Sequence, residues 1–291
     1  MRPKAMGNMG FAVGVPLSPA GGVAITGLDL SLPLTPDAWE CIRGAFRDHH
    51  VVVFPDQVLE REQQYAFVAN FGEIEAHGGR NSHSKRYAVA HVISNLDGAG
   101  NPVDRSSSPV SNYRWHTDKP YYRRPPMLTA LYAVELPPQG GDTEFANTAM
   151  GYAALPDAIK RRIAGLQVVF YWGASARKSD DGGSGRAGFR DEPPVDHPLV
   201  RTHPETGKRA LYLGNHASHI LGMAEPEGKA LLDDLLQHTT KPEFVYTHRW
   251  RKGDLVIWDN RCLLHRAVAN YEISRYRRVL HRSVVRGTVP F

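Results

Sequence analysis

Two histidines and an aspartate are the residues of this chain best suited to share a metal ion. His116 and Asp118 lie two positions apart in the segment Tyr113–Asp118, and in an extended chain residues two apart point to the same face. A distant histidine must complete the set, and His265 is the best candidate because it follows a strand-like segment, Asp254–Trp258, and a polar turn. Two imidazoles and one carboxylate leave coordination positions open, which is the arrangement of non-heme Fe(II) oxygenases.

A second pair of residues could bind the co-substrate that an open iron site needs. Thr143 places a hydroxyl on a sharp turn after Gly140-Gly141-Asp142. Arg278 lies thirteen residues beyond His265, and if residues 276–286 form a strand, Arg278 and Arg282 share one face. A guanidinium beside a hydroxyl can bind a distal carboxylate in a bidentate manner. The alternatives are that Thr143 is a simple turn residue and that Arg282 is an ion-pair partner.

The composition is that of an ordinary globular protein. The chain has 291 residues, 42% hydrophobic and 22% charged, which argues against wholesale disorder. The formal charge of +5 is mild and dispersed, so it favours small anions over nucleic acid, which would require clustered Lys and Arg. Two cysteines and the absence of a long apolar run lead us to expect a cytoplasmic protein with no membrane segment and no signal peptide.

The elements that must position these residues begin with helices and continue as strands. Thr35 followed by Pro36 predicts a helix start, residues 51–54 a buried strand, and residues 60–71 a second helix. Further strands are predicted at 23–30, 87–94, 127–135, 166–172, 198–203, 209–213, 243–250, 254–259 and 276–286, with helices at 155–166 and about 226–238. Early helices followed by many short strands predict a mainly β fold with flanking helices, an antiparallel sandwich or jelly roll.

The chain is expected to form one domain. Residues 1–20 are rich in Gly, Met and Pro and are predicted to be loosely ordered, whereas residues 21–291 form the domain. The segment 173–197 is rich in Gly and charged residues, and a loop of that length is typical of a lid over a site.

The motifs, taken in order, resemble a known family, the Fe(II)- and 2-oxoglutarate-dependent dioxygenases of the taurine dioxygenase and 2,4-dichlorophenoxyacetate dioxygenase group. The resemblance covers about residues 20–290. The matching strings are WHTD (115–118), PPQGGDTEFAN (137–147), HPLVRTHPETGKRALYL (197–213), GDLVIWDNRCLLHRAV (253–268) and RRVLHR (277–282). An HxD pair alone would be a weak signal, but the whole series in this order is highly specific.

The resemblance implies a double-stranded β-helix with Fe(II) on His116, Asp118 and His265. It also implies that 2-oxoglutarate chelates the iron and that Thr143 and Arg278 hold its distal carboxylate. O2 is then the second co-substrate, succinate and CO2 are released, and a substrate C–H bond is oxidised, most simply by hydroxylation. The resemblance further implies a homo-oligomer, a dimer or a tetramer.

The resemblance also suggests residues for the prime substrate, a small anionic organic acid. Arg282 matches the arginine that faces the substrate anion in taurine dioxygenase, and Asn112 matches an asparagine four residues before the HxD histidine. His77 and His216 lie where members of the family shape the substrate pocket, although a structural role is the simpler interpretation of each. The candidate substrates are an aryloxyalkanoate, a sulfonate, an alkyl sulfate or a natural-product carboxylate.

Two other classes of function stay open at this point. A jelly-roll metalloenzyme that does not use 2-oxoglutarate would need the metal residues but would have no use for Thr143 with Arg278. A non-enzymatic binder of nucleic acid would need a block of basic residues, and the sequence has none.

Overall fold

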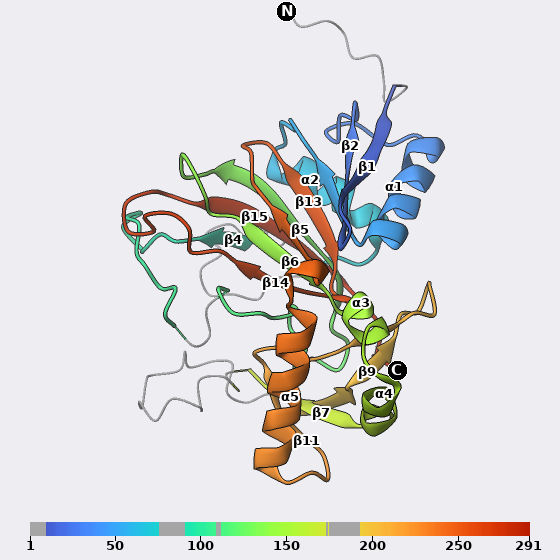
Figure 1. The fold of residues 1–291 in the computed structure, drawn as a ribbon. Coiled ribbons are helices and arrows are strands. Elements are labelled where there is room, and N and C mark those ends of the chain that lie inside the picture. Colours follow the sequence, from blue (N-terminus) through green and yellow to red (C-terminus); the bar gives the residue numbers. More distant parts are fainter. Residues whose placement is uncertain (1–9, 76–90, 109–111, 173, 175–192) are drawn as a thin grey trace, which may run out of the picture.

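The computed structural model describes residues 10–75, 91–108, 112–172, 174 and 193–291. Its main feature is a seven-stranded sheet in the order β1-β2-β3-β13-β5-β15-β4 (Figure 1). The strands of this sheet are β1 (Ala12–Ser18), β2 (Gly21–Thr26), β3 (Val51–Phe54), β13 (Leu255–Asp259), β5 (Pro126–Glu135), β15 (Val279–Arg286) and β4 (His91–Ser94). All neighbouring pairs are antiparallel except β2 and β3.

Three smaller sheets complete the β structure of the described residues. The sheet β12-β6-β14 lies against the large sheet, and the other two have the orders β11-β7-β8 and β10-β9. Their strands are β6 (Thr143–Asn147), β12 (Val245–His248), β14 (Leu263–Ala267), β7 (Gln167–Phe170), β8 (Val195–Pro198), β11 (Ala217–Ile220), β9 (Val200–Thr202) and β10 (Arg209–Leu211). The helices are α1 (Pro36–His49), α2 (Arg61–Val68), α3 (Thr148–Ala153), α4 (Asp157–Ile163) and α5 (Glu225–Thr239), with short 3-10 helices at Ala69–Phe71 and Pro242–Phe244.

Helix α1 shows how local sequence sets an element that supports the sheet. Thr35 is extended and its hydroxyl accepts the N–H of Ala38, as predicted for a helix start with proline at the next position. Ile42 and Phe46 are buried one turn apart, and they pack with residues of β2 and β3 on one face of the large sheet. The helix ends at His49, and the next residue, His50, caps it with a left-handed φ of 63°.

The two faces of the large sheet have different tasks, because alternate residues of a strand point to opposite sides. On β5, Leu128 and Ala130 pack into the apolar core beneath α1 and α2. Leu131 and Ala133 point the other way, into a second core shared with β6 and β14. The same division holds on the adjacent β13, where Leu255 and Ile257 face the helices while Val256 and Trp258 face the smaller sheet. The interior between the two sheets is therefore where inward-facing polar residues can meet.

The mainly β fold with flanking helices agrees with the prediction, but several boundaries differ. Residues 12–18 form β1, whereas the sequence predicted a loosely ordered segment over residues 1–20, of which residues 1–9 lie outside the described residues. Most of the proposed lid, 173–197, also lies outside them, and its last part is strand β8. Five of the described strands had no counterpart in the prediction: β1, β6, β8, β11 and β14.

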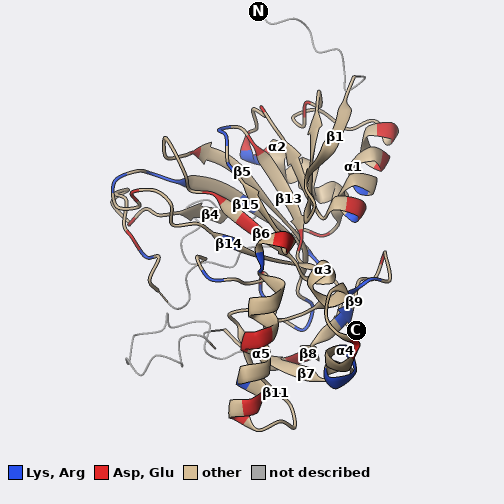
Figure 2. Ribbon diagram, in the orientation of Figure 1, with Lys and Arg blue, Asp and Glu red and all other residues tan. Residues whose placement is uncertain are grey.

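No helix among the described residues is long and apolar enough to cross a membrane. The charges that the structure describes are interspersed along the ribbon, with a basic run on α4 and acidic residues on α5 (Figure 2).

Candidate metal and co-substrate site

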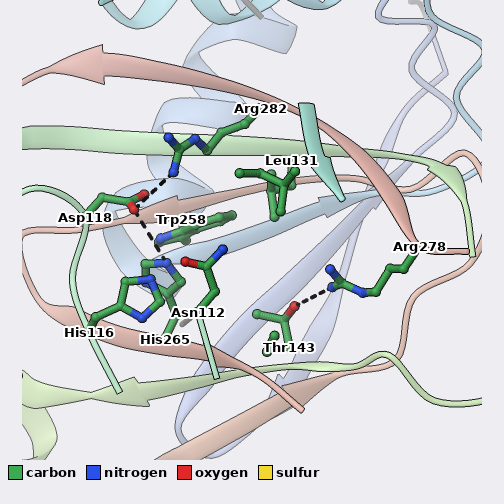
Figure 3. A pocket seen from close by; sticks show the side chains of 11 residues that line it. Asn112, His116, Asp118, Leu131, Thr143, Trp258, His265, Arg278 and Arg282 are labelled. Atoms are coloured by element: carbon green, nitrogen blue, oxygen red, sulfur yellow. Dashed lines mark hydrogen bonds and ion pairs between the residues drawn. The ribbon is translucent and has the colours of Figure 1, made fainter. Parts of the chain in front are cut away.

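His116, Asp118 and His265 meet in the interior between the large sheet and β14 (Figure 3). His116 and His265 come together because their backbones form an antiparallel bridge, with N–H to carbonyl distances of 3.0 and 2.7 Å. Their rings lie 4.1 Å apart between centroids, and Nε2 of His265 lies 3.9 Å from Oδ1 of Asp118. One ligand atom from each residue lies within 4.8 Å of the others. The predicted convergence of these three residues is therefore present in the structure.

Both imidazoles are in the form that can bind a metal. Burial lowers the pKa of His116, and burial together with the neighbouring His116 holds the pKa of His265 well below its usual value, so both rings are neutral at pH 7. Nδ1 of His116 lies 2.7 Å from the carbonyl of Arg114, which as an acceptor requires the proton on Nδ1 and leaves the Nε2 lone pair free. Nδ1 of His265 is buried without a hydrogen-bond partner in the described part of the chain.

Asp118 supplies the negative charge of the set. Burial opposes ionisation of its carboxyl, but Arg282, and after it the two histidines and the Thr129 hydroxyl, hold the pKa of Asp118 well below its usual range. Nη1 of Arg282 lies 3.5 Å from Oδ1 of Asp118. Two neutral imidazoles and one carboxylate, all buried, form a donor set that fits a divalent first-row metal such as Fe(II).

Thr143 and Arg278 lie together on the side of the cavity opposite His116, Asp118 and His265 (Figure 3). Nη2 of Arg278 donates to Oγ1 of Thr143 at 3.4 Å, and Nε donates to the carbonyl of Gly141 at 2.9 Å. Nε1 of Trp250 donates to Thr143 at 2.9 Å, so the hydroxyl is held from two sides. The neighbouring Arg277 points outward, where it pairs with Glu135. The structure thus brings Arg278, as predicted, and not Arg277 to the cavity.

The cavity between the three metal-type residues and the pair Thr143 and Arg278 has an apolar wall and contains a second arginine, Arg282. Its lining is formed by Ile93, Asn112, His116, Asp118, Leu131, Thr143, Trp258, His265, Ala267, Arg278 and Arg282. Asn112 and Arg282, both predicted to face the substrate, are among them. His216 is not among them. Its ring packs edge-on against Tyr121, with 5.1 Å between the centroids, and burial lowers its pKa to about 3. His77 lies outside the described residues.

Sequence reasoning missed three polar residues that support the site. Asn270 accepts the N–H of Gly141 at 2.8 Å and donates to Asp142 at 2.8 Å, so it fixes the turn that carries Thr143. Thr129 on β5 donates to Asp118, and Asn260 donates to Thr129. The sequence gives little signal for these residues. Asn260 and Asn270 lie close to His265 in the sequence, but Thr129 lies on a strand without a predicted site residue, and the partners are 11 to 131 residues away.

Another group of possible ligand atoms, from His50, Asp259 and Cys262, lies outside the cavity. Asp259 is already bound by Arg261, with Nη2 to Oδ2 at 2.7 Å, and by His203 at 2.9 Å. Because a positively charged guanidinium occupies the carboxylate, we interpret this group as structural.

Comparisons with known proteins agree with this geometry. Residues 14–284 match the model of the family described as "Taurine catabolism dioxygenase TauD, TfdA family". The chain is 39% identical over 277 residues to an alpha-ketoglutarate-dependent 2,4-dichlorophenoxyacetate dioxygenase of Cupriavidus pinatubonensis, covering 92% of this chain and 95% of the relative. It is 33% identical over 275 residues to an (S)-phenoxypropionate/alpha-ketoglutarate-dioxygenase of Sphingobium herbicidovorans, covering 92% of this chain and 93% of that one.

A solved structure shares the fold along almost the whole chain. The crystal structure of AAD-2 in complex with Mn(II) and N-oxalylglycine superposes with a TM-score of 0.84 at 36% identity, covering 97% of this chain and 98% of that one. The predictions of the family, of a jelly-roll fold and of a dioxygenase are thereby confirmed. The match over nearly all of its length establishes that the chain belongs to the TauD, TfdA family of dioxygenases.

Proposed function

We propose that His116, Asp118 and His265 hold Fe(II) and that Thr143 and Arg278 bind the distal carboxylate of 2-oxoglutarate. An enzyme of this family works with Fe(II), 2-oxoglutarate and O2, as the sequence predicted. The convergence of the three ligand-type residues in one buried cluster carries this proposal. The Mn(II) and N-oxalylglycine in the related crystal structure support it, since N-oxalylglycine is an isostere of 2-oxoglutarate.

The residues of the chain prepare this chemistry in separate ways. When bound, Fe(II) with 2-oxoglutarate and O2 supplies an oxidant for a substrate C–H bond, with release of succinate and CO2. Arg278 and Thr143 offer donors to a carboxylate and so fix one end of the co-substrate. Trp258 and Leu131, both buried, keep bulk water away from the space between them and the histidines.

We propose further that the prime substrate is an aryloxyalkanoate, a carboxylate with an aromatic body. Arg282 supplies the positive charge, and its buried Nε has no hydrogen-bond partner among the described residues. Ile93, Leu131 and Trp258 supply an apolar wall beside it. Two relatives named for 2,4-dichlorophenoxyacetate and phenoxypropionate support a carboxylate over a sulfonate or sulfate ester.

Two measurements test these assignments. Anaerobic addition of Fe(II) and 2-oxoglutarate should produce the weak visible charge-transfer band of the chelate, and His116→Ala should lose it. A panel of carboxylates, sulfonates and sulfate esters, assayed for O2 uptake and succinate release, should show turnover with aryloxyalkanoates. Arg282→Ala should lose the preference for anions, whereas Arg286→Ala, on the same strand but exposed and paired with Glu73, should keep it. A chain without the band, and with His116→Ala equal to wild type, would refute the iron site.

We propose further that the protein forms a homo-oligomer and that it is located in the cytoplasm. The edge strand β1 exposes Val13, Val15 and Leu17, which supports the homo-oligomer, and sedimentation measurements test it. Both cysteines, Cys41 and Cys262, are free thiols, which supports the reducing cytoplasm, and fractionation of cells tests it.

A further inference from the structure

The two carboxylate oxygens of Asp118 have different surroundings. Oδ2 accepts a hydrogen bond from the hydroxyl of Thr129 at 2.5 Å. Oδ1 lies on the other side, 3.9 Å from Nε2 of His265 and 3.5 Å from Nη1 of Arg282. Oδ1 is therefore the carboxylate oxygen that lies beside His265 and Arg282.

The direction of each hydrogen bond behind Oδ2 follows from a tryptophan. The indole N–H of Trp258 is a donor only, and it lies 3.1 Å from the side-chain oxygen of Asn260. The amide of Asn260 must then present its nitrogen to Thr129, and it does so at 2.9 Å. Because the Thr129 oxygen accepts this hydrogen bond, its own proton is available to Asp118. The proton of Thr129 thus points at Oδ2.

The residues that form this chain of hydrogen bonds are buried and lie on or directly after two adjacent strands. Thr129, Trp258 and Asn260 are 0%, 1% and 2% exposed, so no bulk water competes for their donors. Thr129 lies on β5, Trp258 on the adjacent β13, and the two residues are register partners in the ladder. The Asn260 N–H is in turn bound by the carbonyl of Met127 at 2.8 Å. The orientation of the Asp118 carboxylate is therefore set by two central strands.

We propose that Trp258, Asn260 and Thr129 form a positioning relay that holds Oδ2 of Asp118 away from the metal and so leaves Oδ1 as the single ligand atom. This inference rests on the proposed iron site. A carboxylate free to rotate could offer both oxygens to the metal and occupy a position that the co-substrate or O2 needs. Partners of this kind tune metal affinity by about 10- to 100-fold in other metal sites.

The test compares Thr129→Val, which has the shape of threonine without its hydroxyl, with Thr129→Ser, which keeps the hydroxyl. The probe is Co(II), added anaerobically to the metal-free protein and followed by the intensity and position of its visible d–d bands. We expect Thr129→Val to bind Co(II) about 10- to 100-fold more weakly, with bands shifted by the changed coordination. Thr129→Ser should restore both. Neither readout requires turnover.

The chain offers a matched control in Thr117. This threonine is equally buried. Its hydroxyl donates to the backbone carbonyl of the same Asn260 at 3.0 Å and lies 3.5 Å from the side-chain oxygen of that residue, but it makes no hydrogen bond to the Asp118 carboxylate. Thr117→Val should lower thermal stability as any lost buried hydrogen bond does, while leaving Co(II) affinity and the d–d bands as in wild type. This control distinguishes the general effect of removing a buried hydroxyl from the specific effect of losing the hydrogen bond to Asp118.

A second variant addresses the case in which Thr129→Val does not fold. Asn260→Asp keeps the acceptor for Trp258 but removes the N–H that faces Thr129, so the threonine hydroxyl can turn to the new carboxylate. It should weaken Co(II) binding by the same factor of about 10 to 100, because it draws the same threonine hydroxyl away from Asp118. Folded variants with wild-type Co(II) affinity and wild-type bands would overturn the relay. Failure of the wild-type protein itself to bind Co(II) would instead overturn the proposed metal site.

Discussion

Arg277 and Arg278 are neighbours in the sequence, yet they have opposite roles. Arg277 is half-exposed and pairs with Glu135 on the surface, whereas Arg278 is buried against Thr143 and the carbonyl of Gly141. A planar guanidinium can hold both the turn and a carboxylate, whereas a lysine ammonium is a point charge without that geometry.

We therefore expect Arg278→Lys to raise the KM for 2-oxoglutarate by about 10-fold or more, the size of a lost charged hydrogen bond. Arg277→Lys, one residue away, should change the KM by less than about twofold, because its exposed ion pair is screened. Steady-state kinetics at saturating substrate distinguish the two. Equal effects at both positions would argue against Arg278 as the co-substrate residue.

A second residue, His50, predicts part of the pH dependence of stability. Burial lowers the pKa of His50 to about 4, from 6.5 for the free side chain. The unfolded chain therefore takes up a proton at this residue before the folded chain does. The stabilisation is complete above pH 6.5 and is lost as the pH falls from about 6.5 towards about 4, by at most about 1.4 kcal/mol per pH unit.

The check is His50→Asn, because asparagine accepts the left-handed φ of 63° at this position and does not titrate. Thermal unfolding of the metal-free proteins between pH 7 and pH 5 should show a shallower loss of stability in the variant. Parallel curves for the two proteins would show that His50 does not contribute.

At the scale of single residues, sequence analysis could point to side chains of a type that metal or carboxylate binding requires. It missed side chains whose role depends on how neighbouring strands are aligned. The HxD pair, His265, Thr143 and Arg278 could be identified because metal and carboxylate binding restrict residue type. Thr129 and Asn260 could not, because a threonine in a strand and an asparagine in a turn are ordinary until the neighbouring strand is aligned with them.

Among the elements, the Gly140-Gly141 turn is the one whose shape bears most directly on the site. Gly141 has a φ of 72°, and a Cβ there would lie 3.2 Å from both Cδ and Nε of Arg278. Gly207 provides a matched comparison, with a φ of 68° and nothing within 4 Å of the same position. The two glycines share the backbone strain of a left-handed residue and differ in what a side chain would displace.

We expect Gly207→Ala to lower the stability of the protein by about 1 kcal/mol, the cost of a left-handed alanine. Gly141→Ala should lower it by more, because its methyl group would also lie 3.1 Å from Pro137 and 3.2 Å from Arg278. Only Gly141→Ala should also raise the KM for 2-oxoglutarate, because the new methyl group presses on Arg278. Denaturant unfolding and steady-state kinetics measure the two effects. A normal KM in Gly141→Ala would indicate that Arg278 can shift without consequence.

The elements were predicted best where the pattern was strongest. The helix after Thr35 and the all-apolar strand Val51–Phe54 appear as predicted. Strand β14, which carries His265, was missed because it follows β13 after only a short turn and ends in half-buried residues. Strand β1 was missed because all its residues but one are exposed, so no buried alternation marks it. Such strands are defined by their partners rather than by their own residues.

For the whole molecule, the proposed metal and its co-substrate together join parts of the chain that are far apart in sequence. His116 and Asp118 lie before β5, His265 lies on β14, and Arg278 precedes β15 at the other side of the interior. A ligand that binds only the folded arrangement raises the free energy of unfolding, by about 2.7 kcal/mol at a concentration 100 times its Kd.

We expect Mn(II) with 2-oxoglutarate to raise the Tm of the metal-free protein, and EDTA to reverse the rise. His265→Ala should lose most of the rise, whereas His219→Ala, whose ring contacts Ser218 outside the cavity, should keep it. Differential scanning calorimetry measures the shift. A rise of equal size in His265→Ala would place metal binding elsewhere.

The two faces of strand β5 have different roles, one in packing against the helices and one at the site. Leu128 and Ala130 help to hold the helices on the sheet, while on the other face Leu131 lines the cavity and Thr129 donates to Asp118. A mutation that alters the wall at Leu131 thus leaves the helix-facing core untouched. Over evolutionary time, or in directed evolution, substrate range can diverge along one face while selection for folding acts on the other. We expect libraries at Leu131 and Ile93 to yield many folded variants with altered substrate preference.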